Sequence, residues 1–249
     1  LTEGGIYADL AVRPHERVAL MRLFLCVAHA ALDGPKNYDE WCAVPKLLPG
    51  AARTYLDKWR DSFDLFHPSK PWQQVAGLTK NANGDVPCND DDWTPVSKLN
   101  FSFASGNAST LFDHEGMNAE GRMIPLNETV VSLVTFQCFS VGGLIGQVYW
   151  DGHRCGELAD PKKAYGPVKS ADGPCVPSSM VHTFLRGEDL RQSIHLNMPT
   201  HEEIRTYYPG QTLGKPVWEL PPTSQADSAR IANATTTYVG RLVPLTRLI

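Results

Sequence analysis

The chain has 249 residues, a composition that is ordinary for a globular protein (42% hydrophobic, 20% charged) and a formal net charge of −4. This length suits a fold with a substantial buried core, and we expect a single domain spanning residues 1–249. Because the overall charge is negative, nucleic acid could be bound only through a local patch or with the help of partner subunits. These bulk properties count against a free-standing DNA-binding protein.

The longest apolar run, Val18 to Leu32, is interrupted by Arg22 and His29. It falls short of the roughly 20 apolar residues that a membrane span needs, so it predicts a buried helix and no membrane partner. The six cysteines include no C-x-x-C pair and are too sparse for a disulfide scaffold. We therefore expect reduced thiols in a cytoplasmic protein.

Helical patterns occur at four places along the chain. Each has apolar residues at helical spacing, and the first two carry charged residues near their ends or on the opposite face. The third has Asn127 as its expected N-cap, with a strand as the alternative because of its β-branched residues, and the fourth should turn Leu190 and Ile194 inward. The predicted helices cover Pro14–Leu32, Ala51–Phe63, Asn127–Phe139 and Asp189–Asn197.

Other stretches predict strands and irregular structure. Leu99, Phe101 and Phe103 alternate with polar residues and predict a half-buried strand, and Val181–Arg186 predicts a second, short one. The segment from Tyr238 to Ile249 predicts a turn followed by an extended apolar stretch. Strands and helices do not alternate regularly, so we expect an α+β domain with short sheets, several helices and long loops.

Two prolines break the stretch from Asp64 to Gln74, which predicts an irregular segment laid across the core. Phe66 and Trp72 are large enough that we expect both to be covered. His67 stands between them in an aromatic setting. We expect it to be a hydrogen-bonded structural histidine rather than a catalytic one.

Two loop signals flank the apolar segment Leu126–Phe139. They are Ser105 to His114 (SGNASTLFDH) and Val141 to Gly146 (VGGLIG). Gly, Asn and Ser allow sharp turns in both. Two loops held at the sides of one packed element can form a binding surface on a rigid scaffold. On local composition alone, two ordinary surface turns remain the alternative.

The stretch from Asp151 to Pro177 has little apolar periodicity and the most local positive charge in the chain. Next to the glycine turn, it is a candidate phosphate contact, with a solvated loop as the alternative. Its basic residues are His153, Arg154, Lys162, Lys163 and Lys169.

The motifs of common enzyme classes are missing from the sequence. There is no nucleophile elbow, Walker loop, H-E-x-x-H or dinucleotide fingerprint. Asp113 and His114 with Ser105 or Ser109 make a poor triad, because adjacent Asp and His side chains rarely point at each other. We therefore expect neither catalysis nor a cofactor.

Several short motifs together resemble the N-terminal domain of CasA, the large subunit of the type I-E CRISPR Cascade complex. They follow one another in the family's order across nearly the whole chain, with Trp72 in place of the family's more usual Phe. The motifs are AALDGP (Ala30–Pro35), FDLFHP (Phe63–Pro68) with PWQQ (Pro71–Gln74), SGN (Ser105–Asn107) with TLFDH (Thr110–His114), FLRG (Phe184–Gly187), PVWE (Pro216–Glu219) and GRL (Gly240–Leu242).

The resemblance implies a non-catalytic subunit that contacts the 5′ handle of the guide RNA. It also implies reading of the protospacer-adjacent motif in target double-stranded DNA, and recruitment of the helicase-nuclease beside other Cascade subunits. The residues matching the guide-RNA loop are Ser105, Gly106, Asn107, Thr110, Phe112 and His114. The glycine loop that meets the duplex matches Gly142, Gly143 and Gly146, and Arg154, Lys162, Lys163 and Lys169 are the adjoining basic candidates.

Two departures from the family change what we expect. Some relatives bind zinc through C-x-x-C pairs, but Ala119–Arg122 has no cysteine, so we expect no metal. The family's C-terminal helical bundle is absent, so the chain looks like a fragment, or the ordered part of a longer protein, that binds DNA weakly alone.

A secreted carbohydrate-binding or carbohydrate-active domain is the alternative function. Three N-x-[ST] sequons, at Asn107, Asn127 and Asn233, the aromatic residues and the six cysteines would suit it. Free thiols would favour the cytoplasmic interpretation, and three disulfides the secreted one.

Overall fold

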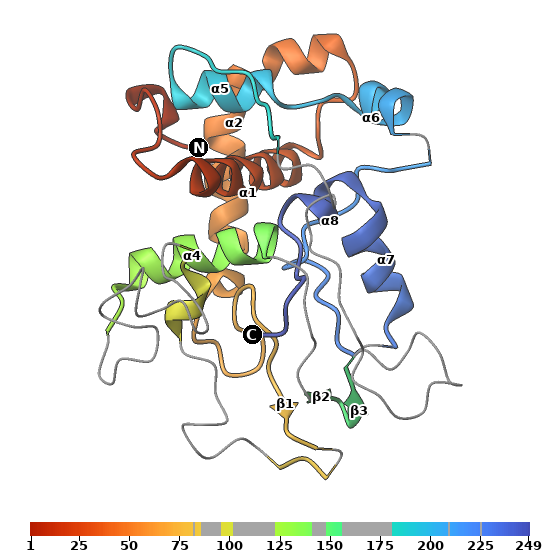
Figure 1. The fold of residues 1–249 in the computed structure, drawn as a ribbon. Coiled ribbons are helices and arrows are strands. Elements are labelled where there is room, and N and C mark those ends of the chain that lie inside the picture. The colour runs from red at the N-terminus through yellow and green to blue at the C-terminus, as the bar shows by residue number, and fades with distance from the viewer. Residues whose placement is uncertain are drawn as a thin grey trace.

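The computed structural model describes residues 1–81, 83–85, 96–101, 123–140, 148–155, 181–208, 210–224 and 226–249 (Figure 1). Within these ranges the chain forms seven α-helices, short 3-10 helices and one three-stranded antiparallel sheet. This confirms the predicted α+β class. The first 3-10 helix, η1, covers Gly4–Ile6.

Helix α1 (Pro14–Leu32) lies at the centre of the arrangement and contacts α2, α4, α5 and α8. Pro14 stands in the first turn, where a helix needs no backbone N–H. Gly34 has a φ of 61° and donates its N–H to the carbonyl of His29 at 2.9 Å. A left-handed glycine of this kind ends a helix, so α1 stops where the sequence predicts.

Helix α2 (Tyr38–Lys58) starts well before the predicted Ala51 and crosses α1 (Figure 1). The start predicted from the sequence is therefore wrong. The helix continues through Pro45 and Pro49, and its buried residues stabilise this part by tertiary packing. The last predicted residues instead form the 3-10 helix η2 (Arg60–Phe63).

Helix α4 (Leu126–Phe139) ends at the predicted residue but begins before Asn127, and it runs beside α1 (Figure 1). Its N-cap is Pro125, so the assignment of Asn127 as the cap is wrong. Gln137 is fully buried and binds the C-terminal segment, with its Nε2 donating to the carbonyl of Arg247 at 2.9 Å. The last residues of the chain therefore lie against α4.

The sheet contains β1 (Leu78–Thr79), β2 (Tyr149–Trp150) and β3 (His153–Arg154), in that order. Asp151 and Gly152 join β2 to β3 with φ values of 52° and 73°. Positive φ at both residues is what a tight two-residue hairpin requires.

The two predicted strands are wrong within the described residues. Val96–Leu99 forms the 3-10 helix η4 and Phe101 lies in a turn, while Phe103 is outside the described residues. Val181–Arg186 has no strand assignment. Side chains hold this segment instead, as Asn197 Oδ1 accepts the backbone N–H of Leu185 at 2.8 Å.

The segment from Asp64 to Gln74 is irregular, as predicted. Trp72 is buried at 5% exposure, but Phe66 is 74% exposed, so the expectation that both are covered is wrong for Phe66. His67 Nδ1 accepts the backbone N–H groups of Ser69 at 3.3 Å and Lys70 at 3.2 Å. This is the predicted structural role for His67.

The C-terminal part is helical. Asp189 caps α5, where Leu190 and Ile194 are buried as predicted, and α8 replaces the turn expected at Tyr238. The capping side chain of α8 is Thr237, whose Oγ1 accepts the N–H of Gly240 at 3.2 Å. The helices are α5 (Leu190–Leu196), α6 (His201–Tyr207), α7 (Ser228–Thr236) and α8 (Tyr238–Leu242).

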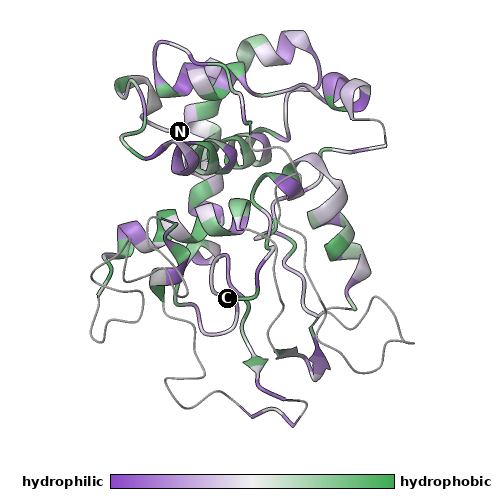
Figure 2. Ribbon diagram, viewed as in Figure 1, coloured by the Kyte–Doolittle hydropathy of each residue, from purple (hydrophilic) through white to green (hydrophobic). Residues whose placement is uncertain are grey.

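Two hydrophobic clusters share α1. One joins α1 to α4, α8 and the two tryptophans Trp72 and Trp218, and the other joins α1 to α2 and α5. Figure 2 shows hydrophobic and hydrophilic residues interspersed along these helices. No helix of the described part is both long and apolar enough to cross a membrane.

Candidate nucleic-acid interface

Most of the predicted nucleic-acid contacts lie outside the described residues. They include all six guide-RNA candidates and the duplex candidates Gly142, Gly143, Gly146, Lys162, Lys163 and Lys169. Arg154 is described, as a half-buried residue of β3 whose register partner is Tyr149. What the structure shows is therefore how the flanks of the predicted segments are held.

The flank before residue 102 is fixed against α1 and α4. Arg13 Nη1 donates to Asn100 Oδ1 at 3.0 Å. The ring of Phe101 contacts those of His15, with centroids 6.0 Å apart, and Phe136, at 5.7 Å. Phe101, the last residue described before the predicted guide-RNA segment, therefore has a defined position beside α1 and α4.

The glycine segment and the basic segment are flanked by residues that contact each other. On one side, the N–H of Cys155 donates to the carbonyl of Val148 at 2.8 Å, next to the β2–β3 hairpin. On the other side, the rings of Phe139 and His182 meet edge to face with centroids 5.1 Å apart. The residues that flank segments 141–147 and 156–180 are thus in contact at both ends of the two segments.

A cation lies against one of these two junctions. The guanidinium carbon of Arg22 lies 5.8 Å from the ring centroid of Phe139, and Arg22 also donates to the carbonyls of Leu242, at 2.7 Å, and Arg241, at 2.6 Å. The two carbonyl bonds fix the guanidinium against Phe139 at the end of α4. Because the ring of Phe139 also contacts His182, Phe139 links Arg22 to the segment that begins at residue 181.

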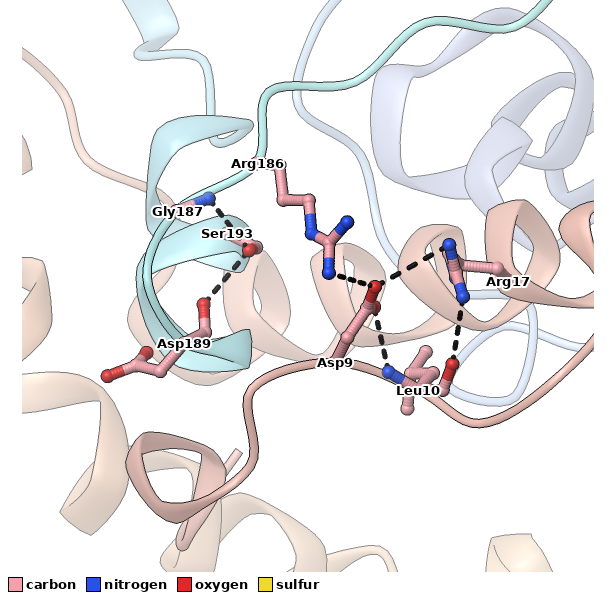
Figure 3. Close-up of polar contacts among 7 residues, drawn as sticks. All are labelled: Asp9, Leu10, Arg17, Arg186, Gly187, Asp189 and Ser193. Carbon is pink, nitrogen blue, oxygen red and sulfur yellow. Dashed lines mark hydrogen bonds and ion pairs between the residues drawn. The ribbon is translucent and has the colours of Figure 1, made fainter.

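The structure adds one polar cluster that sequence reasoning missed (Figure 3). The carboxylate of Asp9 lies 2.8 Å from Arg186 Nη2 and 3.5 Å from Arg17 Nη1, and it accepts the N–H of Leu10 at 2.7 Å. This cluster positions the arginine of the FLRG motif. The wide separation of Asp9 from Arg186 in the chain gives no sequence signal for the pair.

The turn after Arg186 is fixed by Ser193. Its hydroxyl accepts the N–H of Gly187 at 3.0 Å and donates to the carbonyl of Asp189 at 2.9 Å (Figure 3). A Cβ at Gly187 would collide with the side chain of Gln192. The glycine of the FLRG motif is therefore required for close packing on α5.

The strongest pKa shifts in the described part belong to core groups. Burial, with a smaller contribution from His201, lowers the pKa of His29 to about 3, and burial raises the pKa of the Cys26 thiol. Cys26 Sγ donates to the carbonyl of Val239 at 3.6 Å. Their environment keeps both groups neutral, in the packed core around α1.

The candidate metal and glycan features have separate outcomes. Within the described ranges, no group of three or more His, Cys, Asp or Glu side chains could hold a metal ion. The expected lack of zinc stays a prediction, because Ala119–Arg122 is not described. Asn233 exchanges two hydrogen bonds with the backbone of Lys215, at 3.0 and 2.8 Å, so its amide is already engaged rather than presented for a glycan.

Comparison with known proteins finds CasA/Cse1 proteins by sequence and by structure. CasA/Cse1 of Thermus thermophilus is 30% identical over 220 residues, which are 86% of this chain and 36% of that protein. The crystal structure of Thermobifida fusca Cse1 has a TM-score of 0.64 at 23% identity, covering 96% of this chain and 42% of that one. A chain of a pre-nicking CRISPR RNA-guided surveillance complex has a TM-score of 0.55 at 19% identity, covering 86% and 39%.

The chain thus spans less than half the length of these relatives. The model of the family described as CRISPR-associated protein Cse1 matches residues 1–249, that is, the chain from end to end. The chain therefore belongs to the CRISPR-associated protein Cse1 family.

Proposed function

We propose that this chain is the N-terminal region of the large subunit of a cytoplasmic type I-E Cascade complex. In this role it is non-catalytic, contacts the 5′ handle of the guide RNA, recognises the protospacer-adjacent motif in duplex DNA and helps to recruit the helicase-nuclease. Membership of the Cse1 family along the whole chain is the observation that carries the proposal. A relative of the same fold in an RNA-guided surveillance complex supports it.

The flanking contacts support the pairing of the glycine segment with the basic segment at the duplex. The contacts between Val148 and Cys155 and between Phe139 and His182 keep the ends of the two segments close. Glycines allow backbone N–H groups to approach base edges and phosphates, and lysines supply attraction to phosphates that carries no sequence information. Motif reading therefore belongs to Gly142, Gly143 and Gly146, and strength of binding to the lysines.

The guide-RNA contact rests on the segment that starts beside Phe101. Asn100 bonds to Arg13 at the start of α1, and Phe101 packs on Phe136 of α4. These contacts fix the residues that precede the segment containing Phe112. An exposed aromatic ring can stack on an unpaired base, which suits the single-stranded end of a guide RNA. We therefore assign Phe112 the stacking role and Ser105, Asn107, Thr110 and His114 polar contacts around it.

Gel-shift titration of the assembled complex tests the duplex contact. Gly143→Asp adds bulk and a negative charge at the point of closest approach, so motif-containing DNA should bind at least tenfold more weakly. Gly50→Asp is the matched control, because a side chain at Gly50 in α2 would meet nothing within 4 Å. Equal affinity of the Gly143 and Gly50 variants would remove the glycine segment from the interface.

Co-purification tests the guide-RNA contact and the wider proposal. The full-length protein should co-purify with sister subunits and a small guide RNA. Phe112→Ala should weaken this attachment, whereas Phe112→Tyr keeps a ring that can stack and should retain it. Normal attachment of the alanine variant would exclude stacking by Phe112, and a wild-type protein that never associates with a guide-loaded complex would refute the proposed function.

A further inference from the structure

An aromatic pocket is lined by residues other than the predicted nucleic-acid contacts. It has a volume of about 610 Å³ and is formed by the start of α2, the connection from α5 to α6, the end of α6 and the start of α8. These elements lie close to one another in Figure 1. Five of its lining residues are aromatic: Tyr38, Trp41, Tyr207, Tyr208 and Tyr238.

The ring of Trp41 is held in a fixed plane. It stacks on Tyr38, with centroids 5.8 Å apart and an interplanar angle of 16°, and on His195, at 4.0 Å and 29°. Its Nε1 donates to the carbonyl of Met198 at 3.0 Å. The indole is thus preorganised by two stacked rings and by a hydrogen bond at its edge.

Other rings of the pocket remain open to solvent. Tyr38 is 70% exposed, Tyr207 is 73% exposed and Tyr208 is 46% exposed. So much aromatic surface from two separate helices, α2 and α6, is unusual on a surface without a partner. The open mouth suits a side chain presented by a macromolecule better than an enclosed small molecule.

The charge of the pocket selects the chemistry of its occupant. Its lining contains the carboxylates of Glu202 and Glu203 and no Lys, Arg or His. Glu203 is already engaged, because its Oε2 accepts from the N–H and the hydroxyl of Thr200 at 2.7 and 3.0 Å. The Glu202 carboxylate is exposed and makes no ion pair with any residue that the structure describes. A negative aromatic site disfavours phosphate and favours a cation.

We propose that this pocket docks an arginine side chain of a protein partner, so that the guanidinium stacks on the tyrosine rings and pairs with Glu202. Arginine fits better than lysine because its planar, weakly hydrated guanidinium stacks on aromatic faces and pairs with carboxylates through two N–H groups. The partner is a sister subunit of the assembly, and this identification rests on the proposed function.

A titration of the full-length protein tests the chemistry without the complex. Nα-acetyl-L-arginine amide should change the tryptophan fluorescence of the wild type, and Trp41→Phe should abolish the change. The neutral isostere Nα-acetyl-L-citrulline amide should bind at least tenfold more weakly. Glu202→Gln should raise the Kd for the arginine amide about fivefold, while the charge-matched control Asp57→Asn, at an exposed position of α2, leaves it unchanged. Equal binding of arginine and citrulline, or no binding, would overturn the proposal.

Photo-crosslinking in the reconstituted complex identifies the partner. A benzophenone side chain introduced by Tyr38→p-benzoylphenylalanine should crosslink to an arginine-containing segment of a sister subunit, as mapped by mass spectrometry. Crosslinks to guide RNA or DNA, or no crosslink in an intact complex, would refute the docking site and leave the proposed function standing. If the wild type does not assemble, the proposed function fails, and the arginine titration still decides the chemistry of the pocket.

Discussion

At the scale of single residues, Gln137 is the most fully used polar side chain of the core. Its Nε2 donates to the carbonyls of Gln73 and Arg247, both at 2.9 Å, and its Oε1 accepts the N–H groups of Thr246 and Arg247, both at 2.8 Å. Both partner segments are irregular, so they have no ladder of their own to satisfy these backbone groups. One amide thus joins α4 to two segments far apart in the chain.

We predict that Gln137→Leu lowers the free energy of unfolding by about 3 kcal/mol or more, because it leaves buried backbone donors and acceptors without partners. Urea denaturation of the variant and the wild type gives the difference. Gln211→Leu, at a half-buried loop position, should stay within about 0.5 kcal/mol. A similar decrease in the free energy of unfolding in the two variants would show that the hydrogen bonds of the Gln137 amide do not stabilise the fold.

His29 makes stability depend on pH. It is fully buried beside Tyr238, with ring centroids 5.3 Å apart, and its folded pKa is about 3 against an ordinary value of 6.5. Below pH 6.5 the unfolded chain takes up a proton that the folded chain refuses. The contribution of neutral His29 to the free energy of unfolding is therefore complete above pH 6.5. It is lost as the pH falls from 6.5 toward 3, by up to about 1.4 kcal/mol per pH unit.

We predict that His29→Leu removes this part of the pH dependence. The difference in unfolding free energy between wild type and variant should be flat from pH 7 to 8 and should shift in favour of the variant as the pH falls toward 4. Denaturant titrations at each pH measure it. Carboxylates titrate in both proteins, so their contribution cancels in the difference. Parallel pH profiles of the two proteins would show that His29 takes up a proton in the folded chain as readily as in the unfolded chain.

At the scale of elements, α2 shows how tertiary contacts override a local signal. Pro45 cannot donate the N–H that would bond to the carbonyl of Trp41. His195 Nε2 lies 2.9 Å from that carbonyl oxygen and replaces the missing donor, while Val44 and Leu48 of the same turns are buried. The partner of Trp41 comes from α5, so a reading of local sequence could not find it.

We predict opposite effects for alanine at two helical glycines. Gly50→Ala should raise the free energy of unfolding by about 0.5 to 1 kcal/mol, because Gly50 lies inside α2 and a Cβ there meets nothing within 4 Å. Gly240→Ala should lower it by about 1 to 3 kcal/mol, because the Cβ would collide with the carbonyl oxygen of Asn233. Urea denaturation of both variants gives the two signs, and the same sign in both would contradict the packing of α7 on α8.

Elements with an unbroken pattern were predictable, and those defined by distant partners were not. The helix at Pro14–Leu32 follows from its apolar run and end signals, and the helix at Leu126–Phe139 follows from its apolar run. The segment from Val181 to Arg186 has a strand-like composition but no neighbouring strand, and side-chain bonds hold it instead. Asp151-Gly152 is a dipeptide typical of two-residue hairpin turns, although the positive charge around it predicts a basic loop.

The candidate sites differ in the same way. The nucleic-acid segments could be proposed from the sequence because each is a short continuous motif, SGNASTLFDH and VGGLIG, and their contacts stay a prediction. The aromatic pocket combines Tyr38, Glu202 and Tyr238 from three separate helices. No spacing rule connects such residues, so only the packing of α2, α6 and α8 shows that they share a surface.

At the scale of the whole molecule, the net charge of −4 opposes DNA binding, while the proposed interface needs local positive charge. The basic segment carries three lysines, Lys162, Lys163 and Lys169, and its flanking residues contact those that flank the glycine segment. The isolated chain should bind duplex DNA weakly because of its negative charge, and the assembled complex should add the remaining attraction. In the proposed interface the lysines would supply affinity and the glycines would supply motif recognition.

We predict that replacing Lys162, Lys163 and Lys169 with Gln weakens binding of the complex to motif-containing and motif-free duplexes by the same factor. Each lost phosphate contact lowers the slope of log K against log salt concentration by about 0.9, so the slope should fall by about 2 to 3. Gel shifts at several salt concentrations measure it, with the exposed Lys46, Lys58 and Lys70 replaced by Gln as the charge-matched control. An unchanged slope would exclude phosphate contacts by the basic segment, and a selective loss of motif-containing DNA would assign it to motif reading instead.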